Sequence, residues 1–326
     1  MIDNIISTRF SFTKKINRLI SDNNLIIPIS ITIIAAIIFS LTVPNFSNIR
    51  NILNIFEQLG ILGFLAVGMT FVMIAGGIDL SSYTVVSASA VVGATLMVAT
   101  ENVFLGCGLM MMVSVFFGTL NGVAIAYLRM IPFIVTLSTM VLAQGFAIWF
   151  TKAQSIYGLP DIFIEIFSGR LFNFIPVPAI LILVVAIICS FILSMTLYGR
   201  WLYLTGENEK TAEVSNINTQ FAKFTTYIIS GLMAGITAIV LSAVVETSTT
   251  SMVRDVRLMD VIAATVIGGA SLKGGSGSVI GTMFGLLFIT MLGNVFNLLG
   301  VSPFLAMIIK GSVLVAVIGL DVLRTR

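Results

Sequence analysis

The stretch "MIAGGIDLSSYT", residues 73–84, stands out because it places polar groups between two long apolar runs. Each run is long enough to cross a bilayer, which takes roughly 20 apolar residues per helix. An ionisable group inside a membrane is expensive and usually has a partner or a function. Asp79 therefore has two compatible interpretations: a cap for the helix that begins near Thr84, and a part of a solute pathway.

The composition places the whole chain in a membrane. Its 326 residues are 58% hydrophobic and 10% charged, with a mean hydropathy of +1.10, whereas soluble domains have about 25% charged residues. Backbone polar groups cannot face lipid unpaired, so we expect an all-α polytopic membrane protein in contact with the lipid bilayer. The sequence has no histidine, which excludes imidazole catalysis, and its net charge of +3 does not suggest a nucleic-acid partner.

Apolar runs predict about ten transmembrane helices within one transmembrane domain, residues 25–326. The predicted spans lie near 25–43, 57–75, 84–100, 103–127, 133–151, 176–197, 224–245, 258–272, 277–299 and 303–320. The third and eighth are short enough to be partial or re-entrant. Residues 1–24 are expected to be a cytoplasmic segment, either an amphipathic surface helix or a flexible tail.

Lys and Arg are more frequent on one side of this arrangement than on the other. The positive-inside rule then predicts that both termini are cytoplasmic. Lys310 falls within the last predicted span. Near an end of that span it would snorkel to the surface, and in a more central position it would need a partner.

A second glycine-rich break, "VIGGASLKGGSGSVIG", occupies residues 266–281. It aligns with the first break when Gly76-Gly77 is placed on Gly268-Gly269, an offset of 192 residues. Paired glycine-interrupted segments are typical of transporters built from two related halves around a pathway. The glycines predicted to shape the two broken helices are Gly76, Gly77, Gly268, Gly269, Gly274 and Gly275. The alternative is that these glycines only permit close helix packing.

The longest hydrophilic stretch is "YGRWLYLTGENEKTAEVSNINTQFAKF", residues 198–224. It is too polar to enter the membrane and too short to form a domain. A short helix after Gly206 would place Glu209, Ala212 and Glu213 on one side, at i, i+3 and i+4. We expect residues 198–223 to be a cytoplasmic loop that a partner protein grips; a solvated loop without a partner is the alternative.

Polar side chains recur inside several predicted spans. Some will form interhelical hydrogen bonds, but several together suit a weakly polar conduit for an uncharged hydrophilic solute. The residues predicted to border this translocation pathway are Asp79, Ser81, Asn121, Thr136, Asn294 and Asn297.

Five motifs together resemble the permease subunits of ribose-type sugar ABC importers. They are "AVGMTFVMIAGGIDLS" at 66–81, "IPFIVTLSTM" at 131–140, "YGRWLYLTGENEKTAEVSNIN" at 198–218, "DVIAATVIGGASLKGGSGSVIGTMFG" at 260–285 and "NLLGVSPFLAMIIKG" at 297–311. The resemblance implies a multi-pass permease in the cytoplasmic membrane of a prokaryote, which moves a monosaccharide or similar small polyol by alternating access. It also implies three protein partners: a second permease chain, identical or different, a cytoplasmic ABC ATPase and an external sugar-binding protein.

The sequence lacks a phosphate-binding G-x-x-x-x-G-K-[ST] motif, so this chain is not the ATPase. We expect no cofactor or metal in this chain and no catalytic residue, with ATP and magnesium bound by the partner ATPase. By resemblance, the ATPase-coupling helix lies in residues 206–218, and its matching positions are Gly206, Asn208, Glu209, Ala212 and Ile217.

The chain departs from the family pattern at two places. Ser82-Tyr83 replace a valine-glycine pair after the first motif, and Glu207 and Asn216 replace glycines in the coupling segment. Asparagine tolerates the left-handed backbone better than most residues, so the turn at Asn216 is expected to survive. Two alternatives to an importer permease are an ion-gradient-driven secondary transporter of a small polar solute and a non-transporting membrane scaffold.

Overall fold

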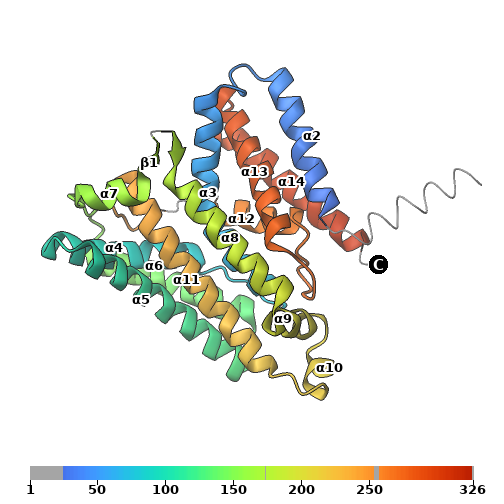
Figure 1. Ribbon diagram of the computed structural model, residues 1–326. Coiled ribbons are helices and arrows are strands. Elements are labelled where there is room, and N and C mark those ends of the chain that lie inside the picture. Colours follow the sequence, from blue (N-terminus) through green and yellow to red (C-terminus); the bar gives the residue numbers. More distant parts are fainter. Residues whose placement is uncertain (1–24, 173, 253–256, 325–326) are drawn as a thin grey trace, which may run out of the picture.

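The computed structural model describes residues 25–172, 174–252 and 257–324, so the predicted N-terminal segment 1–24 lies outside the described residues (Figure 1). The first half contains α2 (Ile26–Thr42), α3 (Ile49–Ile74), α4 (Ser82–Thr100), α5 (Val103–Gly122), the π-helical turn η1 (Val123–Tyr127), α6 (Pro132–Thr151) and α7 (Asp161–Ser168). The second contains α8 (Val177–Met195), α9 (Leu197–Glu207), α10 (Glu209–Val214), α11 (Thr219–Val245), α12 (Arg257–Ile267), α13 (Val279–Leu298) and α14 (Pro303–Arg324). Between them, β1 (Arg170–Leu171) and β2 (Ile175–Pro176) form a small antiparallel hairpin.

The predicted all-α polytopic fold is confirmed. Within the described residues, seven helices are long and apolar enough to cross a membrane, and three shorter apolar helices, Ile26–Thr42, Leu258–Ile267 and Pro303–Val313, accompany them. Each of the ten predicted spans corresponds to one of these helices. The third span is not partial, because α4 has 19 residues, whereas the eighth corresponds to α12 and is short, with 11 residues.

α3 begins two turns earlier than predicted. The sequence places its start near residue 57, but the helix begins at Ile49 because Asn48 caps it, accepting a hydrogen bond of 2.9 Å from the backbone N–H of Arg50. The 26 residues of α3 span about 39 Å at 1.5 Å per residue. The polar residues 51–58 therefore belong to this helix and not to a loop.

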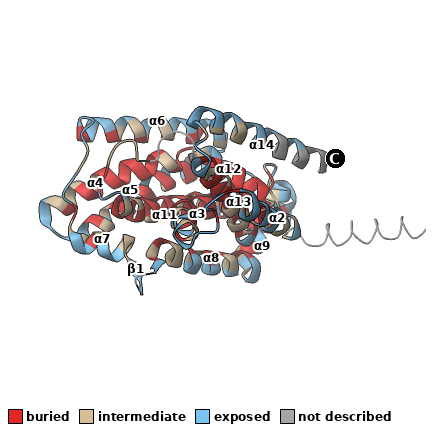
Figure 2. Ribbon diagram, turned by 90° about the horizontal axis from the view of Figure 1, so that it is seen from above, coloured by how far each residue is buried: buried red, intermediate tan, exposed pale blue. Residues whose placement is uncertain are grey.

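α3 and α11 form the centre of the helix bundle. α11 packs against α3, α4 and α5, while α13 packs against α2, α3 and α12. Buried residues are concentrated in these central helices, and α6 and α8 turn exposed faces outward (Figure 2). Those exposed faces carry large apolar side chains such as Trp149, Ile187 and Phe191, as expected for surfaces that contact lipid.

Candidate functional site

The first glycine stretch ends α3 with a Schellman turn. The N–H of Gly77 donates to the carbonyl of Val72 (2.9 Å), and the N–H of Gly76 donates to that of Met73 (2.9 Å). Gly76 has a φ of 80°, in the left-handed region where a side chain is strained. These paired bonds satisfy carbonyls that a helix end leaves free, so the chain leaves α3 sharply and enters residues 77–81.

The second glycine stretch ends α12 with the same turn. The N–H of Ala270 donates to Thr265 (3.0 Å), the N–H of Gly269 donates to Val266 (2.9 Å), and Gly269 has a φ of 92°. Gly269 is thus the structural counterpart of Gly76, and the offset between the breaks is 193 residues, not the predicted 192. The predicted alignment was wrong by one residue. The left-handed glycine is the first of the pair Gly76-Gly77 but the second of the pair Gly268-Gly269.

The other two aligned glycines allow close packing, as the alternative interpretation proposed. A Cβ on Gly268 would lie 2.5 Å from the backbone N and Cα of Thr282, where α12 crosses α13. A Cβ on Gly77 would collide with the hydroxyl of Tyr227 on α11. Both interpretations of the glycine stretches therefore apply, each to different residues.

Gly274 and Gly275 lie in the loop between α12 and α13, and this loop contacts the end of α3. The N–H of Gly275 donates to the carbonyl of Ile74 (2.9 Å). A Cβ on Gly274 would lie 2.9 Å from the Cα of Gly76, and both loop glycines have positive φ, 93° and 74°. The two breaks thus touch each other through backbone atoms.

Gly206, near the end of α9, completes this contact. A Cβ on Gly206 would collide with the carbonyl oxygen of Ile74 and lie 2.6 Å from the N of Gly275. We call Ile74, Gly76, Gly206, Gly274 and Gly275 the glycine junction. The sequence indicated a role for the four glycines, but it assigned Gly206 to the coupling loop and the others to helix breaks. Only the structure brings these three segments together.

A side-chain hydrogen bond strengthens the link between α9 and the α12–α13 loop. The hydroxyl of Tyr203 donates to the carbonyl of Gly277 at 2.7 Å. Burial raises the pKa of Tyr203 above its usual value, so its hydroxyl stays protonated and able to donate at neutral pH. α9 and the loop are therefore joined one turn from Gly206.

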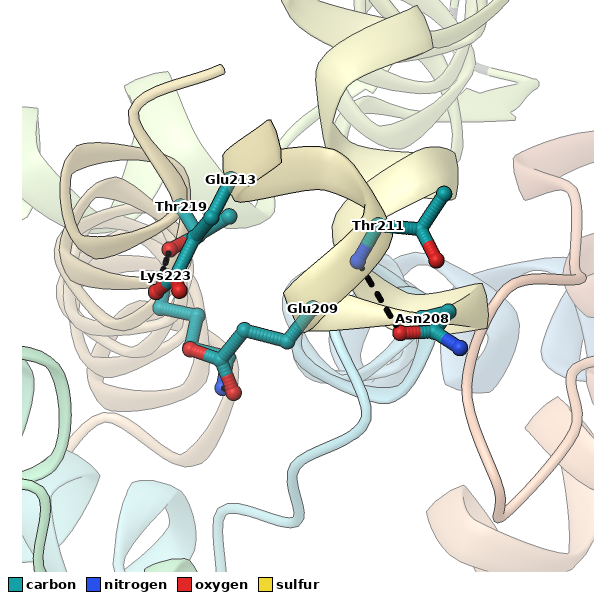
Figure 3. Close-up of polar contacts among 6 residues, drawn as sticks. All are labelled: Asn208, Glu209, Thr211, Glu213, Thr219 and Lys223. Atoms are coloured by element: carbon teal, nitrogen blue, oxygen red, sulfur yellow. Dashed lines mark hydrogen bonds and ion pairs between the residues drawn. The ribbon is translucent and has the colours of Figure 1, made fainter. Parts of the chain in front are cut away.

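The predicted short helix after Gly206 is α10, which lies with α9 at the end of the bundle opposite the α2–α3 connection (Figure 1). Asn208 caps α10 by accepting from the N–H of Thr211 at 3.1 Å. Glu209 forms an ion pair with Lys223 of α11 at 2.6 Å, and Glu213 accepts from the hydroxyl of Thr219 at 3.2 Å (Figure 3).

These contacts change the predicted docking face. Ala212 is only 2% exposed, so it packs within this chain and is not a freely projecting small residue. The side chain of Glu209 keeps 44% of its surface exposed while it pairs with Lys223. Sequence spacing placed Glu209, Ala212 and Glu213 on one side of α10, but it contained no sign that α11 covers part of that side.

The departure at Asn216 is accommodated as predicted. Asn216 has a φ of 61°. The N–H of Ile217 donates to Ala212 (3.1 Å) and that of Asn216 donates to Glu213 (3.0 Å), which is again a Schellman turn. α10 therefore ends as a glycine would end it, and Ile217 lies half-buried beyond the turn.

Three predicted pathway residues, Asp79, Ser81 and Asn121, form one buried polar network beside the first break. The Asp79 carboxylate accepts from the N–H and hydroxyl of Ser81 (2.9 and 2.6 Å) and from the hydroxyl of Ser230 (2.6 Å). Asn121 donates to the Ser81 hydroxyl (2.8 Å) and accepts from Thr139 (2.6 Å). Three hydrogen bonds satisfy the carboxylate and join the segment before α4 to α11, and the bonds of Asn121 and Thr139 add α5 and α6.

Thr136 joins the same region from α6 by donating to the carbonyls of Ile78 (3.2 Å) and Pro132 (2.9 Å). A cavity of about 760 Å³ lies beside the start of α4, and its polar lining includes Tyr83, Thr84, Ser87 and Gln144. Tyr83, the departure from the family pattern, thus fills space at the cavity wall. The predicted cap is not formed: Ser81 stands at the N-cap position of α4 without a side-chain cap bond, and Asp79 instead accepts from the backbone N–H of Ser81 just before the helix.

The remaining two predicted pathway residues lie elsewhere, on α13. Asn294 and Asn51 of α3 exchange reciprocal side-chain hydrogen bonds of 2.9 and 2.7 Å. Asn297 is exposed and lines a different cavity, of about 240 Å³. Asn51 was not predicted, because it lies before the predicted start of α3 near residue 57.

Lys310 has the partner that a central position requires. Its ammonium lies 2.8 Å from the Asp260 carboxylate of α12, and the two side chains are 19% and 8% exposed. Lys310 is seven residues into α14, about 10 Å from the helix start. The ion pair therefore lies two turns inside α14. Because Asp260 neutralises Lys310 there, the lysine does not need to snorkel to the surface.

The fold and these polar sites define a multi-pass membrane transport protein. The family model described as "Branched-chain amino acid transport system / permease component" matches residues 51–318. The chain belongs to this family of transport-system permeases.

Curated relatives match over nearly the whole chain. The ribose import permease protein RbsC of Bacillus subtilis is 36% identical over 289 residues, covering 88% of this chain and 89% of the relative. The D-allose transport system permease protein AlsC of Escherichia coli is 32% identical, covering 89% of each. The L-arabinose ABC transporter permease protein AraH of Azospirillum brasilense is 30% identical, covering 87% and 84%. No solved structure matches significantly. The relatives favour an ABC permease over an ion-driven transporter.

Proposed function

We propose that this chain is the membrane-spanning permease of an ABC importer for a monosaccharide or similar small polyol. In this proposal it works with a second permease chain, a cytoplasmic ATPase that binds ATP and magnesium, and an external sugar-binding protein. Both termini and α10 face the cytoplasm of a prokaryotic cell. The sugar is proposed because the ribose, allose and arabinose permeases match over most of their length.

The glycine junction is the observation that carries this mechanism. The α9–α10 corner rests on backbone atoms of Ile74 and Gly275, with no side chain between them. Packed elements of this kind have discrete arrangements and do not deform continuously. A force on α10 from the ATPase would therefore move the ends of α3 and α12 together.

Movement of the ends of α3 and α12 would also displace residues of the proposed polar pathway. Asp79 follows α3 by five residues, and its hydrogen bond to Ser230 links that segment to α11. Asp260 lies on α12 and pairs with Lys310 of α14. ATP-driven rearrangement at the junction would thus act on both cavities and open the path to one side at a time.

The test is co-purification of the ATPase from native membranes, using charge changes at the Glu209–Lys223 pair. Glu209→Lys should reduce capture of the ATPase. The same change breaks the internal ion pair, so Glu209→Lys/Lys223→Glu serves as the matched control because it restores the pair with its polarity reversed.

Continued loss of capture in the double variant supports a direct contact between Glu209 and the ATPase. Recovery in the double variant assigns the effect to the α10–α11 contact inside this chain. If the wild-type complex contains no ATPase, and the purified chain alone moves sugar down an ion gradient in liposomes, the importer proposal is wrong.

A further inference from the structure

Two cavities beside α3 share Gln58 and Leu62 in their linings. One, of about 490 Å³, follows α3 from Asn54 to Leu65 and is closed by α11. The other, of about 240 Å³, lies between α3, α12, α13 and α14. The smaller cavity alone has the volume of about eight water molecules at ~30 Å³ each, which is room for one monosaccharide.

Polar side chains of α3 line the way into these cavities. Asn54, Glu57 and Gln58 share one face of the helix, at i, i+3 and i+4 spacing. Within a membrane helix such a stripe is expensive unless it faces water, a polar partner or a solute. The stripe was missed from the sequence because "NILNIFEQ", residues 51–58, stood mostly before the predicted start of the helix.

Thr290 of α13, which lines the smaller cavity, carries an unused hydrogen-bonding group. It is 5% exposed, lines the cavity, and its hydroxyl is buried without a hydrogen-bond partner among the described residues. Buried polar groups are rarely left unpaired, because desolvation without a bond costs free energy. A bound hydroxyl-bearing solute would supply the missing partner.

The charges of these cavities occur in opposite pairs. Asp260 and Lys310 line the smaller cavity at 2.8 Å from each other, and Glu57 of the larger cavity lies 3.8 Å from Arg170. The described walls therefore offer strong donors and acceptors without an excess of either charge. Such walls suit a neutral polyol, whose hydroxyls both donate and accept, better than an ionic solute.

We propose that these two cavities contain a solute-binding subsite in which Gln58, Thr290 and the Asp260–Lys310 pair hydrogen-bond one neutral polyol. This inference rests on the proposed import function and adds the residues that contact the solute. It also shifts the main contact surface from the Asp79 network, whose groups satisfy one another, to the α3–α12–α13–α14 side.

The first experiment measures ATP-driven uptake of radiolabelled D-ribose, D-allose and L-arabinose by the complete importer in proteoliposomes. Thr290→Val keeps the shape of the side chain and removes only its hydroxyl. We expect it to lower the uptake of the transported sugar up to tenfold, with thermal stability and basal ATP hydrolysis unchanged. Thr151→Val is the matched control: Thr151 is buried on α6, its hydroxyl donates to the Ala147 carbonyl of the same helix, and the change should leave uptake unchanged.

The second experiment detects occupancy without transport. In a Cys107→Ala/Cys189→Ala background, Thr290→Cys should react with a small methanethiosulfonate reagent, and the transported sugar should slow that reaction several-fold. Choline chloride at equal osmolality should not slow it. Wild-type uptake rates in both Thr290→Val and Gln58→Leu, together with no protection of Thr290→Cys, would overturn the subsite while leaving the import function intact. Failure of the wild-type importer to take up any of the three sugars would overturn both.

Discussion

Gly206→Ala tests the glycine junction most directly. The added methyl group would collide with the Ile74 carbonyl oxygen and lie 2.6 Å from the Gly275 nitrogen, and neither is a flexible side chain that can turn away. Overpacking of this kind costs about 1–3 kcal/mol. Displacement of the Gly275–Ile74 hydrogen bond, now 2.9 Å long, adds about 1 kcal/mol.

One effect acts in the opposite direction. Gly206 lies in α9 and has no positive φ, so alanine gains about 1 kcal/mol of helix propensity. The expected net destabilisation is therefore about 1–3 kcal/mol. Gly108→Ala is the matched control, because Gly108 lies inside α5 and an added Cβ there meets nothing within 4 Å; it should be neutral or slightly stabilising.

Two measurements separate stability from coupling. Thermal unfolding in detergent gives the shift between the variants and the wild type, and Trp201 on α9 is a local fluorescent probe. The ratio of sugar taken up to ATP hydrolysed in proteoliposomes reports coupling. We expect Gly206→Ala to lower both the unfolding temperature and this ratio. Equal stability and equal coupling in Gly206→Ala and Gly108→Ala would refute the steric argument.

Three further perturbations are expected to have measurable effects. Lys310→Met leaves the largely buried Asp260 carboxylate without its ammonium partner, and should cost about 3–5 kcal/mol in thermal-shift measurements; adding Asp260→Asn should recover most of that loss. Burial raises the pKa of Tyr198 to about 12, although its hydrogen bond with Thr225 lowers it. The unfolded tyrosine ionises near 10, so stability should fall from pH 10 to about pH 12, less steeply in Tyr198→Phe; identical slopes would contradict this. Asn297→Leu should reduce sugar uptake without loss of assembly, since Asn297 lines a cavity while the Asn51–Asn294 pair stays intact; unchanged uptake would remove Asn297 from the pathway.

The membrane fold was predictable because it depends mainly on the hydropathy of each segment, which can be read from the local sequence. A helix that crosses lipid must be apolar over most of its length and must hydrogen-bond its own backbone groups. Hydropathy alone therefore located the ten apolar helices of the described residues. The boundary of α3 was not predictable from hydropathy, because the polar residues 51–58 look like a loop when their neighbours are unknown. The cap at Asn48 was the available local signal.

The candidate site was predictable only in its parts. Glycine stretches indicated the two breaks, and spacing indicated α10. The partners of these segments depend on contacts between residues far apart in the chain, such as Gly206 with Ile74 and Gly275. Neither periodicity nor composition contains that information.

A polytopic helical membrane protein with two glycine turns and a polar loop follows from the sequence alone, because bilayer solvation and backbone conformation act residue by residue. Three properties follow only from the tertiary structure: the polar loop contacts both turns, Asp260 neutralises Lys310, and Thr290 lines a cavity with no hydrogen-bond partner for its hydroxyl among the described residues. These properties depend on which surfaces of the helices are in contact. Close packing and electrostatic pairing between residues that are distant in the sequence determine those contacts.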